Sequence, residues 1–261
     1  MSALHFETRG RGKDLVLLHG WGLNLRVWDE LARALARTRR VIAIDLPGHG
    51  RSDWDPRAVT PAAQAWRVHA TLAPLTERYA LLGWSLGGQF ALDLAAAMPA
   101  AIERLVLVAT TPRFLAAPGW RCGMAPALLT RLAERLRHGR DAAVEEFLAL
   151  CARGGAPRTA GRVLEALRAA LARHGAAHPE ALANGLERLA QCDLRAALPQ
   201  LRAPTLVIAG RHDRITRAAA SRALAARLGD ARYVEFAGAA HAPFLSHPAR
   251  FAQTLAGFLR G

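Results

Sequence analysis

Cysteine and long apolar runs are scarce in this chain, and each shortage argues against a class of protein. The three cysteines, Cys122, Cys151 and Cys192, lack C-x-x-C spacing, so we expect small buried or lid-lining thiols rather than a disulfide framework or a zinc site. No apolar stretch reaches the roughly 18 residues of a membrane span, and Glu7 and Arg9 interrupt the first ten residues. The sequence predicts a cytoplasmic protein, without a membrane partner, a metal ion or an organic cofactor.

Negative charge is also in short supply. The chain has 35 basic and 21 acidic residues, a net charge of +14, and nearly all of its positive charges are arginines. No nucleic-acid-binding motif accompanies them, so we expect no nucleic-acid partner. Residues 113–173 hold eleven arginines against five acidic residues, a net of +6. This excess suits an acidic protein partner through electrostatic steering, and a solvated helix face accounts for it equally well.

The most informative segment is Gly83-Trp-Ser-Leu-Gly87, which follows a short apolar run and has the form G-x-S-x-G. In this pattern a serine stands on a tight strand-to-helix turn, and the flanking glycines let the strand and the helix close around it. Ser85 is therefore the candidate nucleophile.

An earlier apolar run ends in His19-Gly-Trp-Gly22, a glycine-bracketed loop. This loop resembles the oxyanion loop of α/β-hydrolases, in which two N–H groups are directed at the developing oxyanion, one from the residue after the nucleophile and one from the early loop. By position these belong to Leu86 and Trp21. We interpret His19 as a residue that fixes this loop, because the base is expected after the acid in the chain.

Two later loops complete the order Ser–Asp–His. Asp213 follows the apolar run 204–210, and His241 lies between the run 231–236 and a final helix. An imidazole activates a serine by taking its proton, and a carboxylate orients that imidazole. Asp213 and His241 are therefore the candidate acid and base.

Other titratable residues compete for these roles. His212 adjoins Asp213 and cannot easily turn toward it, while His247 precedes Pro248, which favours a helix start. Asp45, in the turn Asp45-Leu-Pro-Gly-His-Gly-Arg-Ser52, is interpreted as a satisfied turn carboxylate.

Strand patterns alternate with helical ones up to about residue 111 and resume at Pro204, which predicts one α/β domain over residues 1–261 with a helical lid inserted at about 112–193. We expect a monomer, although no sequence pattern determines the oligomeric state. Leu128, Leu132 and Leu136 repeat at helical spacing, and breaks at 154–157 and 175–179 separate helices.

These motifs together resemble the α/β-hydrolase superfamily and, within it, the carboxylesterases of biotin synthesis that demethylate the methyl ester of pimeloyl-acyl-carrier protein. The matching segments are Leu15-Val-Leu-Leu-His-Gly-Trp-Gly-Leu-Asn24, Asp45-Leu-Pro-Gly48, Gly50-Arg-Ser52, Leu82-Gly-Trp-Ser-Leu-Gly-Gly88, Phe147-Leu-Ala-Leu150 and Ala239-Ala-His-Ala-Pro-Phe-Leu-Ser-His-Pro248. One departure is Thr216, where the wider family often has proline.

The resemblance implies an α/β-hydrolase fold with a mostly parallel sheet, a serine carboxylesterase activity, and acyl-carrier protein as the partner that bears the substrate. It also implies a substrate-binding wall that includes the oxyanion loop, the nucleophile, the base and part of the lid: Trp21, Ser85, Leu86, Phe147, Leu148, Ala149, Leu150, Cys151 and His241. Arg158 and Arg162 lie four residues apart on one expected helix face, with Arg153 before them, and form the candidate docking group for the carrier protein.

Two other functions use the same residues. A broad short-chain carboxylesterase or a carbon–carbon bond hydrolase would share the triad and differ in the lid. A non-enzymatic ligand receptor can be built on the same fold, although a complete set of candidate catalytic residues weighs against it.

Overall fold

The structure is a computed structural model that describes residues 3–260. Seven strands form one sheet in the order β1-β3-β2-β4-β5-β6-β7, and every neighbouring pair is parallel except β1 and β3. The strands are β1 (Phe6–Arg9), β2 (Lys13–Leu18), β3 (Arg39–Ile44), β4 (Tyr79–Trp84), β5 (Ile102–Val108), β6 (Thr205–Gly210) and β7 (Ala231–Phe236). All six residues of β4 are buried, as expected for a parallel strand covered on both faces. The predicted α/β-hydrolase fold is confirmed.

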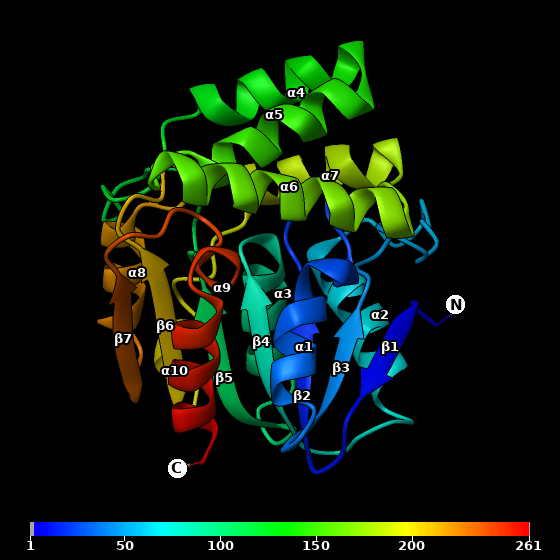
Figure 1. The fold of residues 1–261 in the computed structure, drawn as a ribbon, viewed down its shortest axis with the longest axis vertical. Coiled ribbons are helices and arrows are strands. Elements are labelled where there is room, and N and C mark those ends of the chain that lie inside the picture. Colours follow the sequence, from blue (N-terminus) through cyan, green and yellow to red (C-terminus); the bar gives the residue numbers. More distant parts are fainter. Residues whose placement is uncertain (1–2, 261) are drawn as a thin grey trace.

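Helices cover both faces of the sheet (Figure 1). Helices α1 (Asp29–Leu35) and α10 (Pro248–Arg260) pack together on one face, while α2 (Pro61–Leu72), α3 (Leu86–Ala97) and α8 (Ala218–Ala225) lie on the other. The short helix α9 (Pro243–Ser246) precedes α10, and the 3-10 turns Leu25–Trp28 and Leu198–Gln200 complete the elements outside the inserted segment.

Four helices separate β5 from β6 and form a layer beyond the carboxyl ends of the parallel strands (Figure 1). They are α4 (Ala127–His138), α5 (Arg140–Ala152), α6 (Pro157–His174) and α7 (Pro179–Gln191). Two of the three breaks between them coincide with those predicted from sequence, and the third lies at Gly139, between α4 and α5. Proline in the first turn suits α6 and α7 because its missing N–H has no helical acceptor there, and Gly175, with φ +103°, follows the last residue of α6.

The strand order places the site. From β2 the chain moves outward to β3 and then returns to β4 on the other side of β2. Loops after β2 and β4 therefore diverge at their carboxyl ends, which is where α/β sheets form ligand crevices. The loop that begins at His19 and the turn that carries Ser85 meet at this point.

Candidate active site

Ser85 is held in a strained turn between β4 and α3. Its φ of +55° and ψ of −116° lie outside the regions that residues with a side chain prefer. A Cβ on Gly83 would lie 2.3 Å from the Gly87 carbonyl oxygen, and a Cβ on Gly87 would lie 2.4 Å from the carbonyl oxygens of Leu18 and His19. The two glycines therefore let strand, helix and early loop approach each other around the serine.

The loop after β2 lies directly against this turn. A Cβ on Gly20 would stand 3.4 Å from the Ser85 Cβ. Leu86 is the first residue of α3, so its N–H has no acceptor within the helix. The structure thus brings Trp21 and Leu86, the two predicted oxyanion residues, to the same turn as Ser85.

His19 is buried and spans the loop as the sequence suggested. Its Nδ1 donates to the Gly20 carbonyl at 2.8 Å, and its Nε2 accepts from the Leu46 N–H at 3.0 Å. Burial lowers the pKa of His19, which keeps its ring neutral in this arrangement.

Asp213 and His241 meet through a hydrogen bond. His241 Nδ1 lies 2.7 Å from Asp213 Oδ2, and both side chains are fully buried. A carboxylate can only accept, so Nδ1 carries the proton and Nε2 presents its lone pair. Within residues 3–260, Nε2 is buried and has no hydrogen-bond partner, and no hydrogen bond joins it to Ser85 Oγ. Nucleophile–base hydrogen bonds are often long before substrate binds.

The backbone around each of these residues explains their placement. Asp213 Oδ1 accepts from the N–H groups of Ile215 at 2.7 Å and Thr216 at 2.9 Å, so threonine supplies a donor that proline would lack. The His241 carbonyl accepts from Trp84 Nε1 at 2.8 Å, and the His241 N–H donates to the Cys151 carbonyl at 3.2 Å. Residue 241 is therefore anchored both to the nucleophile strand and to the inserted helix α5.

The competing histidines lie elsewhere. His212 is exposed. His247 shares a 2.8 Å hydrogen bond with Ser246 Oγ, and its carbonyl accepts from the Phe251 N–H in the first turn of α10. These contacts suit a helix-start role and not that of a base.

Asp45 is satisfied in its turn, and it also has a partner that the sequence did not indicate. Its oxygens accept from the N–H groups of Leu25 at 2.8 Å and Arg51 at 3.0 Å. In addition, Oδ2 lies 2.7 Å from Nε2 of His174, the last residue of α6. The molecule thus contains a second buried Asp–His pair.

Aromatic rings from the body and the inserted segment gather at His241. The Phe147 ring centroid lies 5.1 Å from that of Trp21 and 6.2 Å from that of His241. Cys151 is buried one helical turn beyond Phe147, and burial raises the pKa of its thiol well above the usual range. Of the other predicted wall residues, Leu148 is buried and Ala149 and Leu150 are half-buried. In the described chain, no hydrogen bond or ring contact links these three to the predicted triad.

Sequence reasoning missed the contact between α7 and the early loop. Trp21 Nε1 donates to the Leu182 carbonyl at 2.9 Å, and a Cβ on Gly185 would lie 2.7 Å from Trp21 Cδ1. The available signal was Gly185 itself, because an isolated glycine inside a helical pattern usually marks close packing.

A cavity of about 610 Å³ lies between α4 and α7. Leu129, Leu136 and Leu186 are among its mostly apolar lining residues, and none of the predicted triad residues is. The inserted segment therefore borders an apolar space whose lining residues do not include Ser85.

The side chains of the three candidate docking arginines are exposed. A Cβ on Gly154, next to Arg153, would lie 2.4 Å from the His212 carbonyl oxygen, so the α5–α6 turn rests on the loop of Asp213. Several other arginines of the inserted segment, though not all of them, are neutralised, including Arg131 by Glu146 and Arg168 by Glu145. Among the ion pairs of the described chain, none involves the three docking candidates, which are Arg153, Arg158 and Arg162.

Comparison with known proteins agrees with this geometry. The family model for the alpha/beta hydrolase fold matches residues 14–248. An esterase from Exiguobacterium antarcticum superposes with a TM-score of 0.87 over 99% of this chain and 96% of that one, at 23% identity, which shows the shared fold. The chain belongs to the α/β-hydrolase family.

Two curated relatives identify the family to which the chain belongs within the α/β hydrolases. The proteins of Nitrosomonas europaea and Aromatoleum aromaticum are both named pimeloyl-acyl-carrier protein methyl ester esterase. The first is 41% identical over 96% of this chain and 97% of its own length, and the second is 43% identical over 95% and 98%. The chain therefore belongs to the pimeloyl-acyl-carrier protein methyl ester esterase family, and the protein is a carboxylic ester hydrolase. Within residues 3–260, no helix is long and apolar enough to cross a membrane.

Proposed function

We propose that the protein hydrolyses the methyl ester of pimeloyl-acyl-carrier protein in biotin synthesis, with Ser85, His241 and Asp213 as its catalytic triad. The observation that carries this proposal is the buried Asp213–His241 hydrogen bond, which leaves the base nitrogen of His241 unpaired in a loop bonded to Trp84, next to Ser85. The names of the two relatives supply the substrate.

In the proposed reaction, Ser85 Oγ attacks the ester carbonyl carbon while His241 Nε2 takes the hydroxyl proton. The N–H groups of Leu86 and Trp21 hold the oxyanion. The C–O bond to the methoxy group then breaks, and the protonated His241 gives its proton to the leaving oxygen, which releases methanol. Water attacks the acyl-enzyme with His241 again as base, which frees the carboxylic acid and restores Ser85.

Replacement of the nucleophile tests the mechanism. Ser85→Ala should lower kcat for a methyl pimeloyl ester on carrier protein by about 10⁴ or more. The matched variant Ser246→Ala removes a hydroxyl that, among residues 3–260, bonds only His247 and the Pro243 carbonyl, and it should retain wild-type activity. A folded Ser85→Ala variant with more than a tenth of the wild-type rate would require a different nucleophile.

The wall formed by Trp21 and Phe147 is proposed to bind the methylene chain. Burial contributes about 0.8 kcal/mol per CH₂. Phe147→Ala should therefore reduce kcat/KM for a pimeloyl-length ester more than for an acetyl ester. Phe258→Ala, on α10, is the control and should affect both esters alike. Equal losses in Phe147→Ala would place Phe147 in the packing of α5 and leave the short-chain esterase as the better description.

The inserted segment 112–193 is proposed to act as a lid, with Arg153, Arg158 and Arg162 on its outer surface receiving acidic acyl-carrier protein. Their exposure, their lack of ion pairs among residues 3–260 and the contact of the turn beside Arg153 with the Asp213 loop support this role. We further propose a cytoplasmic monomer, which gel filtration with light scattering would check.

A further inference from the structure

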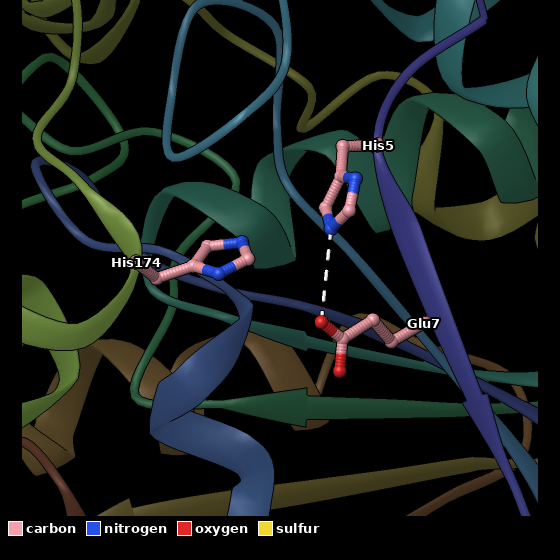
Figure 2. Close-up of side chains that lie close together, drawn as sticks. All are labelled: His5, Glu7 and His174. Carbon is pink, nitrogen blue, oxygen red and sulfur yellow. Dashed lines mark ion pairs between the residues drawn. The ribbon is translucent and has the colours of Figure 1, made fainter.

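A second group of polar side chains lies at the opposite edge of the sheet from Asp213 and His241. His5 precedes β1, Glu7 lies on β1, and His174 ends α6. One possible ligand atom from each of the three lies within 4.8 Å of the other two, and His5 Nε2 is 3.8 Å from Glu7 Oε1. His5 and Glu7 share a face because side chains alternate along extended chain. Figure 2 shows the His5 ring and the Glu7 carboxylate pointing toward each other, with the His174 ring beside them.

Two nitrogen atoms of this group are buried without a partner among the described residues: His5 Nε2 and His174 Nδ1. Buried polar atoms usually find a hydrogen bond, so each one needs an explanation. His174 Nε2 is occupied by the Asp45 carboxylate at 2.7 Å, so Nε2 carries the proton and Nδ1 presents a lone pair.

This arrangement has the features of a metal site. Histidine ligands of metals commonly donate their other ring N–H to a carboxylate, as His174 does to Asp45. Two imidazoles and a carboxylate suit borderline divalent ions such as Zn²⁺ or Co²⁺, whereas Mg²⁺ and Ca²⁺ prefer oxygen. Ligand atoms around tetrahedral zinc lie roughly 3.4 Å apart, given bonds of about 2.0–2.1 Å, so small side-chain rotations would close the group.

We propose that His5 Nε2, Glu7 Oε1 and His174 Nδ1 bind one divalent transition-metal ion. The site has a structural role: the ion joins the N-terminal edge strand to the end of lid helix α6. The half-exposed side chains of His5 and Glu7 give the ion access from solvent. Arg26 also pairs with Glu7, and a carboxylate has enough lone pairs to serve both. The sequence alone predicted no metal, because His5 and His174 lie far apart in the chain.

The test uses chelator-treated full-length protein and Co²⁺ as the probe. Wild type and His138→Gln, a control at the exposed end of α4, should bind one Co²⁺ per chain by calorimetry. His5→Gln and Glu7→Gln should each bind it at least about 10-fold more weakly. At a Co²⁺ concentration about 100-fold above the wild-type Kd, the melting temperature of wild type should rise by roughly 5 °C or more, and that of His5→Gln should rise by about half as much or less.

Three results would overturn the proposal. Wild-type affinity in His5→Gln would place the ion elsewhere, and so would an equal loss in His138→Gln. A thiolate charge-transfer band in the Co²⁺ spectrum would assign the ion to the cysteines.

Discussion

The two buried Asp–His pairs of this protein have nearly the same construction. In each, the carboxylate accepts two backbone N–H groups and lies 2.7 Å from an imidazole nitrogen, and all four side chains are fully buried. Asp213–His241 uses Nδ1 of the histidine and leaves Nε2, whereas Asp45–His174 uses Nε2 and leaves Nδ1.

What differs is the surroundings of the remaining nitrogen. The His241 loop is bonded to Trp84, beside the strained Ser85 turn, while His174 lies 5.1 Å, ring to ring, from His5. A buried Asp–His hydrogen bond therefore orients an imidazole without making it catalytic. In our proposals its chemistry depends on the group that the second nitrogen faces, which is a proposed nucleophile in one pair and a set of proposed metal ligands in the other.

The largest expected difference between the pairs is in activity. His241→Leu should lower kcat by about 10⁴ or more, because Ser85 loses its base. His174→Leu, a matched change, should keep kcat within tenfold of wild type. Steady-state kinetics on a methyl ester, at a temperature where circular dichroism shows both variants folded, decides the matter. Similar losses in both variants would mean that the Asp45 pair also supports catalysis.

The free energy of unfolding should fall by a similar amount in His241→Leu and His174→Leu. Removal of the imidazole leaves a buried carboxylate without one of its donors, which costs about 3–5 kcal/mol, so both leucine variants should lose free energy of unfolding of this order. The Gln variant at position 174 keeps a donor for Asp45 and should lose less. Urea unfolding measures all three. A His174→Leu variant as stable as wild type would show that the two backbone donors satisfy Asp45 alone.

The free energy of unfolding should fall at acid pH partly because of His49, which lies in the same turn as Asp45. Burial lowers the pKa of His49 to about 3, against about 6.5 when unfolded. Below pH 6.5 the His49 imidazole is protonated in the unfolded chain but stays neutral in the folded chain. The free energy of unfolding therefore falls as the pH falls toward 3. Between pH 7 and pH 5 this one group should remove about 2 kcal/mol. His49→Gln should show a correspondingly smaller acid loss in urea unfolding, and an unchanged difference between the two pH values would refute the assignment.

The smallest expected effect is on the hydrolysis rate of the carrier-linked ester, and it comes from exposed arginines of the inserted segment. Charge reversal at Arg158 and Arg162 should slow hydrolysis of the carrier-linked ester a few-fold at low salt, because each exposed ion pair contributes only about 0.2–1 kcal/mol. Hydrolysis of p-nitrophenyl esters should be unchanged. Reversal of Arg33 and Arg37, two exposed arginines with the same spacing, is the control. Should the carrier-linked rate respond equally to both double reversals, the docking proposal would fail.

Much of the site could be predicted because it is encoded in short motifs. Ser85 and its glycines specify one turn, and the order of Ser85, Asp213 and His241 follows the strand order of the fold. The prediction that Asp45 is a satisfied turn residue agrees with its two N–H donors. The ion-pair partners of the arginines in the inserted segment could not be predicted. Arg168 of α6, for example, pairs with Glu145 of α5, and the relative position of these two helices depends on packing.

The sequence by itself determined the fold family, the tight turn at Ser85, the glycine-bracketed loop after β2 and the helical insertion, because each depends on local backbone preferences and on apolar periodicity. Only the tertiary structure decided that His174 meets Asp45 and gathers with His5 and Glu7, and that Gly185 makes room for Trp21. These contacts join residues more than a hundred positions apart. The physical reason is that such a hydrogen bond forms only when the packing of the inserted helices on the completed sheet brings its donor within 3 Å of its acceptor, and no local pattern records that packing.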